Sequence, residues 1–359
     1  MRLMGWNANT NLTFGSFHID IAPIIIVAFF TTLLVFGTKI GARVDGAMTV
    51  LKIAIVFFVV IVGFFYVKAS NFTPFIPPSE PAASTDGSGV SAVMEQPLWQ
   101  WATGMAPSIY GVTGIISGAA LVFFAFLGFD VVATASEETI NPKKNVPLGI
   151  GVGLGLIIVL YTLVAIVTTG MVSYKDLAKQ SAFKMVGADW AAKIISLGIV
   201  IGMATVVMVL LLGLTRVVFA MSRDGLLPRG LSHTGKHGTP VRLQIIVGVV
   251  MALIAACCNV GILSDMVNIG TLSAFTLVAI SIPIMRKKRP DLERSFKIPG
   301  NPWVPILIAL ANLWLMVNLS VLTWIRFVVW LIVGFAIYFG YGYRHARLGA
   351  GELEVAAQE

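Results

Sequence analysis

A stretch in the first half of the chain places glycine, aromatic residues and a carboxylate inside an apolar run. In TGIISGAALVFFAFLGFDVVATASEE, Gly128 stands between aromatic residues and is followed closely by Asp130. A break in a membrane helix frees backbone N–H and C=O groups, which can hydrogen-bond an ammonium or a carboxylate group. Alternatively, Gly128 packs against a neighbouring helix, and the phenylalanines are ordinary lipid-facing or core side chains. The residue pattern by itself favours neither interpretation.

Lys52 is the second candidate for chemistry, because it stands inside another apolar run. It lies roughly 9 Å from the cytoplasmic end of that run at the usual rise of a helix. Burial lowers the pKa of a lysine, so such an amine can exchange a proton near neutral pH. A lysine this shallow can also extend its amine to the membrane surface, which leaves both roles open. Arg216, one turn before a later loop, is interpreted as an anchor of that second kind.

No other combination of side chains suggests catalysis or metal binding. Cys257 and Cys258 are adjacent, and the four histidines are scattered along the chain. This spacing indicates neither a disulfide framework nor a metal site. The apolar runs hold no paired carboxylates and no nucleophile beside a base. We therefore expect a protein that is not an enzyme and that uses no metal and no cofactor.

The composition is that of an integral membrane protein. Of the 359 residues, 57% are hydrophobic and 12% are charged, and the mean hydropathy is +0.89. A soluble protein carries about 25% charged residues. The net charge of +8 is attributed to basic cytoplasmic loops, since membrane proteins concentrate lysine and arginine there. Nucleic-acid binding is therefore not expected.

The apolar runs predict an all-α, polytopic membrane protein with nine transmembrane helices. The runs are Ile21–Gly37, Ala47–Val67, Thr113–Ser136, Pro147–Val172, Ile194–Met221, Leu243–Cys258, Met266–Met285, Trp303–Leu322 and Phe327–Tyr343.

The basic residues predict the orientation of these helices. Assigning the loop after the first run to the cytoplasm places most of the 25 lysines and arginines there, including those of 223–242 and 286–297. The positive-inside rule then puts the N-terminus outside and the C-terminus in the cytoplasm. Residues 1–20 lack an apolar h-region, so no cleavable signal peptide is expected. Residues 70–112 contain no lysine or arginine and are predicted to form an extracellular loop.

Four stretches carry a resemblance to a known family. FFAFLGFDVVATASEETINPKKNVPLGI resembles the sixth helix and following inner loop of the amino acid–polyamine–organocation superfamily, in its cationic amino acid transporter branch. The other three are similar to later or earlier parts of the same proteins, in the same order. They are TKIGARVDGAMTVLKIAIVFFVVIVGFFYV, MATVVMVLLLGLTRVVFAMSRDGLLPR and MRKKRPDLERSFKIPGNPWVP.

The resemblance implies a partial LeuT-type inverted-repeat fold. Such proteins are similar in having twelve helices, ten of which form two inverted repeats around the substrate. The nine runs match helices four to twelve, so helices one to three, including the first broken helix, have no counterpart in these residues. The implied segments are 1–69 with the outer N-terminal part and first two helices, 70–112 as the loop, 113–285 as the second repeat, and 286–359 with the inner loop, last two helices and tail.

The same resemblance implies roles for individual residues. The unwound part of the sixth helix would lie at Phe124, Ala125, Phe126, Leu127 and Gly128, with backbone carbonyls facing the amine of the substrate. Phe129 would close over it, and Phe124 would contact its side chain. Met203 and Thr205 would line the pocket from another helix. Asp130 would cap the inner half-helix, whose dipole suits a carboxylate. Lys52 would carry a coupled proton, as in proton-coupled members. Glu137, Glu138, Lys143 and Lys144 would form a charge set in the inner loop.

These expectations give two functional hypotheses. The first is a secondary amino acid permease of the plasma membrane, proton-coupled, with an amino acid as its small-molecule substrate and the lipid bilayer as its other partner, and incomplete as residues 1–359 alone. The alternative is a membrane scaffold or sensor that does not transport. Either form would self-associate or recruit a partner subunit in place of the missing helices.

Overall fold

The computed structural model describes residues 11–14, 17–35, 38–81, 93–105, 108–134, 139–177, 180–233, 240–257, 260–291, 294 and 297–345. The chain divides into two compact units, and each is described by itself. The first unit comprises Met1–Phe75, Gly128–Cys257 and Tyr341–Glu359. The second comprises Ile76–Leu127 and Cys258–Gly340.

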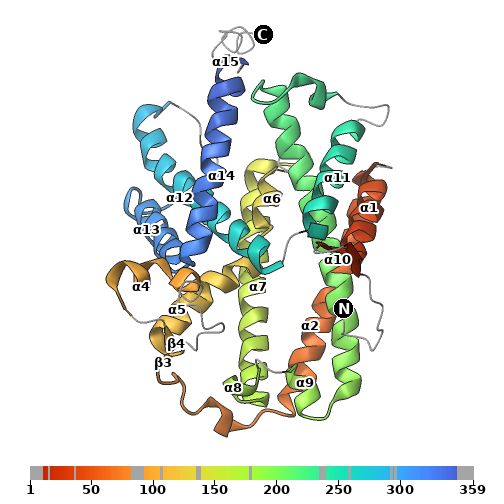
Figure 1. Ribbon diagram of the computed structural model, residues 1–359, viewed down its shortest axis with the longest axis vertical. Coiled ribbons are helices and arrows are strands. Elements are labelled where there is room, and N and C mark those ends of the chain that lie inside the picture. Colours follow the sequence, from red (N-terminus) through yellow and green to blue (C-terminus); the bar gives the residue numbers. More distant parts are fainter. Residues whose placement is uncertain are drawn as a thin grey trace. The chain divides into compact units, whose positions relative to one another are not determined.

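The first unit begins with a hairpin and continues with helices (Figure 1). Strands β1 (Asn11–Phe14) and β2 (Phe17–Asp20) pair antiparallel, with Asn11 opposite Asp20. The helical elements are α1 (Ile21–Val35), α2 (Thr38–Phe64), η1 (Ala69–Phe72), α6 (Phe129–Thr134), α7 (Pro142–Met171), α8 (Tyr174–Leu177), α9 (Ala182–Met185), α10 (Asp189–Arg223), η4 (Arg229–Ser232), α11 (Val241–Cys257) and α15 (Tyr343–His345).

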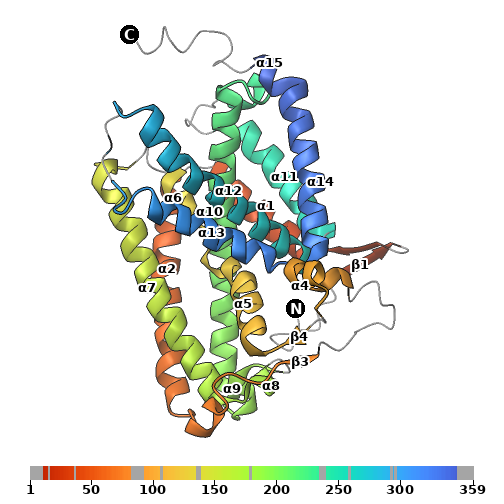
Figure 2. The ribbon, with the colours of Figure 1, turned by 90° about the vertical axis from the view of Figure 1, so that its left-hand side faces the viewer.

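Two hydrophobic clusters hold the first unit together. In one cluster, α2, α7, α9 and α10 meet around Val59, Val167 and Phe183. In the other, α1, α10 and α11 meet around Leu34, Leu211 and Leu243, each of which is at most 1% exposed. Helix α10 belongs to both clusters, so it connects the helix pair α2–α7 to the helix pair α1–α11. Within each pair the two helices lie side by side (Figures 1 and 2).

The second unit is built around a long helix, α12 (Val260–Lys288). Its other elements are β3 (Glu80–Pro81), α4 (Leu98–Thr103), β4 (Ser108–Ile109), α5 (Gly111–Val122), η2 (Phe123–Phe126), α13 (Trp303–Val317) and α14 (Val321–Ile337), followed by a π-turn η5 (Tyr338–Gly342) that crosses the unit boundary. The core joins α5, α12 and α13 through Ala120, Ile269, Leu272 and Met316. Strands β3 and β4 pair antiparallel, Glu80 opposite Ile109.

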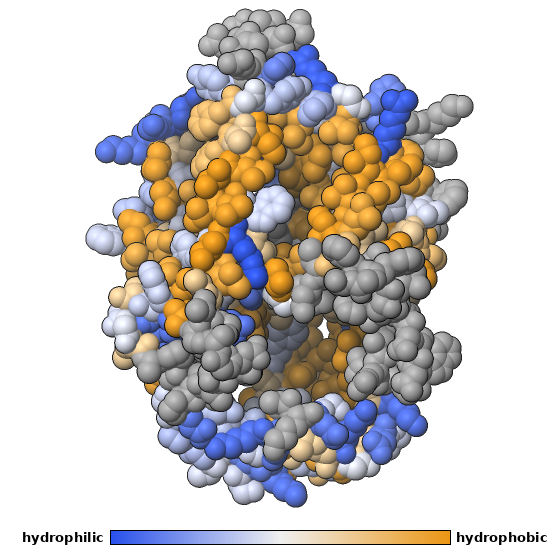
Figure 3. All heavy atoms as spheres, in the orientation of Figure 1, coloured by the Kyte–Doolittle hydropathy of each residue, from blue (hydrophilic) through white to orange (hydrophobic). Residues whose placement is uncertain are grey.

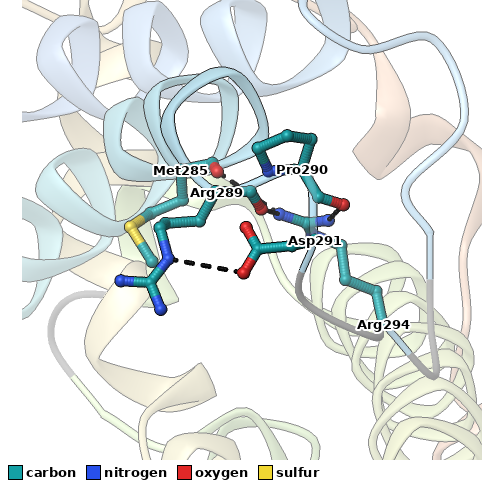
Figure 4. A network of polar contacts seen from close by, with 5 residues as sticks. All are labelled: Met285, Arg289, Pro290, Asp291 and Arg294. Atoms are coloured by element: carbon teal, nitrogen blue, oxygen red, sulfur yellow. Dashed lines mark hydrogen bonds and ion pairs between the residues drawn. The ribbon is translucent and has the colours of Figure 1, made fainter.

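Arginine side chains close the C-terminal end of α12 (Figure 4). The last carbonyls of a helix have no partner within it. Arg294 donates to the carbonyl oxygens of Arg289 at 2.6 Å, Met285 at 3.3 Å and Pro290 at 3.5 Å. An ion pair joins Arg289 Nε to Asp291 Oδ2 at 3.7 Å. Of the three carbonyls that Arg294 contacts, only that of Met285 belongs to α12, which ends at Lys288, so Arg294 mainly holds the turn that follows the helix.

The membrane-spanning candidates follow the order of the predicted runs. Five helical segments of the described chain are long and apolar enough to cross a membrane, and four apolar helices are shorter, with 10–17 residues. The five are Gly46–Phe64, Pro142–Met171, Asp189–Arg223, Gly261–Lys288 and Val321–Gly342, and the four are Pro23–Val35, Gly111–Phe126, Val241–Cys257 and Trp303–Val317. The number of crossings stays a prediction. In Figure 3 apolar residues make up much of the visible surface over α11 and α14, interrupted by hydrophilic ones. On these two helices Ile245, Val249, Trp330 and Phe335 are among the exposed hydrophobic residues.

The structure differs from the sequence expectations in two respects. Helix α2 begins at Thr38 and α12 at Val260, several residues before the predicted runs, because a helix can continue through polar residues where hydropathy already falls. Four short strands add to the all-α prediction. The run Thr113–Ser136 is interrupted, in the stretch where the resemblance implies an unwound segment. The segment boundaries that the resemblance implies concern internal repeats, and they stay a prediction.

The loop that was predicted to lie outside is tied to the turn between α13 and α14. Pro97 forms an antiparallel bridge with Ser320, and Leu98 N donates to Leu319 O at 3.0 Å. The indole Nε1 of Trp99 donates to Asn318 Oδ1 at 2.9 Å. Within the second unit, this loop and this turn therefore lie at the same end.

Candidate functional site

The candidate site is an interruption between α5 and α6. Helix α5 ends at Val122, and the tighter 3-10 turn η2 covers Phe123–Phe126. Leu127 is extended, with φ −65° and ψ 145°, and its N–H donates to Phe124 O at 3.3 Å. Gly128 has φ +112°, and its carbonyl accepts from Val131 N at 3.2 Å as α6 begins. The helix is therefore broken over two residues within the stretch that the resemblance singled out.

The backbone angle explains why residue 128 is glycine. A φ of +112° is open to glycine and strained for other residues. No described atom lies within 4 Å of the position that a Cβ on Gly128 would occupy. Close packing against a neighbouring helix, which was the alternative explanation, therefore does not account for this glycine.

The aromatic residues before the break differ in their surroundings. Phe123 is half-buried and makes an edge contact with Phe275 of α12, with the ring centroids 6.2 Å apart. Phe124 is 42% exposed, Ala125 is exposed, and Phe126 and Leu127 are half-buried. Phe123 thus anchors the turn, and Phe124 presents an open apolar surface.

Lys52 lies against α10 through its aliphatic stem. A Cβ on Gly202 would lie 3.8 Å from Cγ and from Cε of Lys52, which is an ordinary contact distance, so the lysine stem packs beside this glycine. Lys52 stands near the middle of α2, although near the start of its apolar segment Gly46–Phe64. Its side chain is half-buried.

Thr205 and Met203 have opposite surroundings on α10. Thr205 is 1% exposed, and its hydroxyl donates to Gly202 O at 2.9 Å. Met203 is 59% exposed. Residues two positions apart in a helix point to nearly opposite sides, so Met203 and Thr205 do not share one face of α10. Gly202 brings Thr205 and Lys52 into the same region of the first unit, and it is a residue that the sequence did not single out.

The proposed site residues fall in both units. Phe124, Ala125, Phe126 and Leu127 belong to the second, whereas Gly128, Phe129, Met203, Thr205 and Lys52 belong to the first. Phe129, the first residue of α6, is half-buried. Asp130 lies in α6, but its side chain is outside the described part, as are Glu137 and Glu138. Lys143 and Lys144 lie in the first turn of α7. The roles of these residues in binding stay predictions.

Asn268 of α12 was missed by the sequence analysis. Its side chain is fully buried, and Nδ2 donates to the carbonyl oxygen of Leu121, in the last turn before the break, at 3.3 Å. A lone asparagine in the run MVNIGTLSAF was the only available signal. Nothing in that run connects it to residues nearly 150 positions earlier, which only the packing of α12 on α5 brings together.

Comparison with known proteins places this arrangement in a family. Residues 5–340 match the family model described as amino acid permease. The chain belongs to the amino acid permease family. This family is one of integral membrane transporters rather than enzymes, as the sequence resemblance indicated.

Individual relatives agree with the family match. The chain is 39% identical over 341 residues to a branched-chain amino acid permease of Bacillus subtilis, covering 93% of this chain and 66% of that protein. It is 40% identical over 329 residues to a methylthioribose transporter of the same organism, covering 90% and 64%. It is 34% identical over 280 residues to a mitochondrial cationic amino acid transporter of Arabidopsis thaliana, covering 77% and 42%. The chain therefore spans about two thirds of the length of the two Bacillus relatives.

Proposed function

We propose that the protein is a secondary amino acid permease of the plasma membrane, which works by alternating access and makes no covalent bond to its substrate. The observation that carries the proposal is the break at Leu127 and Gly128, in a chain of the amino acid permease family. A break exposes backbone groups in a membrane only where they are satisfied by protein or by a bound polar molecule.

The carbonyl groups from Phe124 to Gly128 are proposed to bind the amine of the amino acid. Carbonyls at the C-terminal end of a helix carry partial negative charge, which complements an ammonium group. Phe124, with its open apolar surface, is proposed to contact the substrate side chain. Phe129 is proposed to close over the bound molecule. Met203 and Thr205 point to nearly opposite sides of α10, so only one of them can line the pocket from that helix.

Lys52 is proposed to couple a proton to the movement of the substrate. Its stem is held against α10 at Gly202, three residues before the buried Thr205. An amine in this apolar setting loses its proton when water leaves, because burial disfavours the charged form. A conformational change that dries or wets this region would therefore bind or release a proton.

The N-terminus is proposed to lie outside and the C-terminus in the cytoplasm. The attachment of residues 97–99 to residues 318–320 agrees with the predicted alternation of the spans, which puts both segments on the same side of the membrane. The basic loop at the other end of α13, where Arg294 bonds to the turn after α12, agrees with the cytoplasmic excess of positive charge.

Residues 1–359 are proposed to supply only part of the transport machinery. Alternating access in this fold moves one repeat against the other around two broken helices, and the described part of the chain provides the one at Gly128. The other is proposed to come from a further part of the polypeptide, a second copy or a partner subunit. Residues 1–359 alone would then insert into a membrane without completing a transport cycle.

Uptake into proteoliposomes tests the proposal. The protein would be purified from the cells that naturally produce it and reconstituted into liposomes. Uptake of radiolabelled branched-chain, cationic and small neutral amino acids would then be measured, and labelled methylthioribose would be tested as an alternative substrate. Saturable uptake of an amino acid supports a permease. Uptake of methylthioribose alone would assign a different substrate, and no uptake above protein-free liposomes would favour the scaffold or sensor hypothesis.

A further inference from the structure

The hydrogen-bond pattern of the chain changes at the end of α5. In an α-helix a carbonyl accepts from the N–H four residues later, whereas in a 3-10 turn the N–H pairs three residues back. At the change from α5 to η2 after Val122, the backbone N–H of Phe123 points to the carbonyl oxygens of Ala119 and Leu121. A carbonyl oxygen has two lone pairs, so the Leu121 carbonyl can accept a side-chain donor as well.

Asn268 supplies a donor at this position. Its Nδ2 lies 3.3 Å from the carbonyl oxygen of Leu121, and its side chain is 0% exposed. The amide comes from a different helix, so it fixes the end of α5 relative to α12 and not merely within its own chain segment.

The rest of the same α12 face also holds the turn. Leu272 and Phe275 follow Asn268 at helical spacing on one side of α12. Leu272 is fully buried in the cluster with Ala120, and Phe275 contacts the ring of Phe123. Apolar contacts hold α5 and η2 against α12 along this face, and Asn268 adds a polar contact between α5 and α12.

The burial of this asparagine carries an energetic penalty. Its Oδ1 is buried and meets no hydrogen-bond donor in the described part of the chain, and a buried acceptor without a donor destabilises the fold. An apolar residue of similar shape would avoid that penalty. The hydrogen bond that Nδ2 of Asn268 donates to the Leu121 carbonyl offsets part of this penalty.

We propose that Asn268 is a positioning residue. By donating a hydrogen bond to the Leu121 carbonyl, it holds the helix in its interrupted conformation. The inference rests on the proposed function, since it assigns Asn268 to the site where the amino acid binds. Without this amide, the turn at Phe123–Phe126 would lose its fixed position, and the carbonyls that follow would no longer be presented in one geometry.

Hydrogen–deuterium exchange of the reconstituted protein, as its own cells produce it, tests this role without any ligand. The variants are Asn268→Leu, which removes the amide at similar shape, and Asn268→Gln, which keeps an amide. Asn312→Leu is the matched control, because Asn312 of α13 has a buried Nδ2 that meets no acceptor among the described residues. We expect Asn268→Leu to speed exchange of the peptide covering residues 123–127 by roughly tenfold. The Gln variant and the control should stay within about twofold of the parent.

Two results would overturn the inference. One is exchange at residues 123–127 in Asn268→Leu within about twofold of the parent. The other is an equal increase throughout α12 and α13, which would mark a general packing defect. Uptake of the amino acids named above is measured in parallel. If the parent protein transports none of them while the exchange pattern holds, the proposed function fails and the structural role of Asn268 stands.

Discussion

The stem of Lys52 on α2 passes over Gly202 on α10, where a Cβ would lie 3.8 Å from both Cγ and Cε of the lysine. This contact sets the direction in which the side chain of Lys52, the only lysine of the apolar segment Gly46–Phe64, extends from α2. The stem of this lysine thereby lies against α10, the helix that connects both hydrophobic clusters of the first unit. Movement of α10 would change the surroundings of the charge.

Replacing Lys52 by methionine is expected to separate binding from coupling. Methionine keeps an unbranched stem against Gly202 but carries no proton. Uptake driven by an imposed pH gradient should fall to the rate seen without a gradient, while binding of the amino acid stays measurable. Lys193→Met serves as the control, because Lys193 is an exposed lysine on α10, the helix against which Lys52 of α2 packs. Wild-type acceleration by the gradient in Lys52→Met would return Lys52 to a purely structural role.

The packing of α2 on α10 predicts opposite outcomes for two glycines one turn apart. A Cβ on Gly198 would lie 2.5 Å from Cδ1 of Ile55, whereas one on Gly202 meets Lys52 at ordinary contact distance. Gly198→Ala should lower the stability of the unit by about 1–3 kcal/mol through overpacking. Gly202→Ala should be neutral or gain up to about 1 kcal/mol of helix propensity. Thermal unfolding in detergent decides this, and equal midpoints for both variants would contradict the packing.

Gly128 is expected to be sensitive to substitution because of its backbone angle and not because of crowding. Alanine at φ +112° should destabilise the break by about 1–3 kcal/mol. Gly118→Ala, in the regular part of α5 with open space around it, is the matched control and should be neutral or slightly stabilising. The comparison uses uptake and thermal unfolding. A Gly128→Ala variant as active and as stable as Gly118→Ala would argue against a required break.

Phe129→Ala is expected to weaken binding of the amino acid. The aromatic ring follows the break directly as the first residue of α6, and its loss would admit water to the carbonyl groups. A tenfold rise in the dissociation constant corresponds to about 1.4 kcal/mol. Equilibrium binding of the radiolabelled substrate measures the effect, with Phe64→Ala at the exposed end of α2 as the control. Unchanged affinity for every amino acid tested would remove Phe129 from the site.

The sequence was sufficient to predict the order of the apolar helices and the stretch that contains the break. Hydropathy marks the segments that enter hydrocarbon, so Ile21, the first residue of both the first run and α1, was placed correctly. Helix ends were less accurate, because α2 continues through Lys39 and Arg43 without regard to polarity. Gly128 left two explanations open, and its φ angle and the open space beside it distinguished them.

The polar contacts between helices could not be predicted. Asn268 and Leu121 meet through the packing of α12 on α5, and no local pattern records that encounter. Gly202 likewise has no special sequence context, since its importance lies in the side chain of a different helix. Residues that contact another helix can be recognised only once the tertiary packing is known. The residues that break a helix, by contrast, can be recognised in the local sequence.

Gradient-driven uptake by proteoliposomes tests the central claim most directly. Two preparations are compared: the protein as its own cells produce it, and a polypeptide of residues 1–359 alone, each with labelled amino acids and an inward proton gradient. The account predicts saturable uptake in the first that is abolished by Gly128→Ala and kept by Gly118→Ala, and no uptake in the second. Uptake by residues 1–359 alone would show that they suffice. Absence of amino acid uptake in the first preparation, or uptake indifferent to Gly128→Ala, would contradict a permease that binds its substrate at the break.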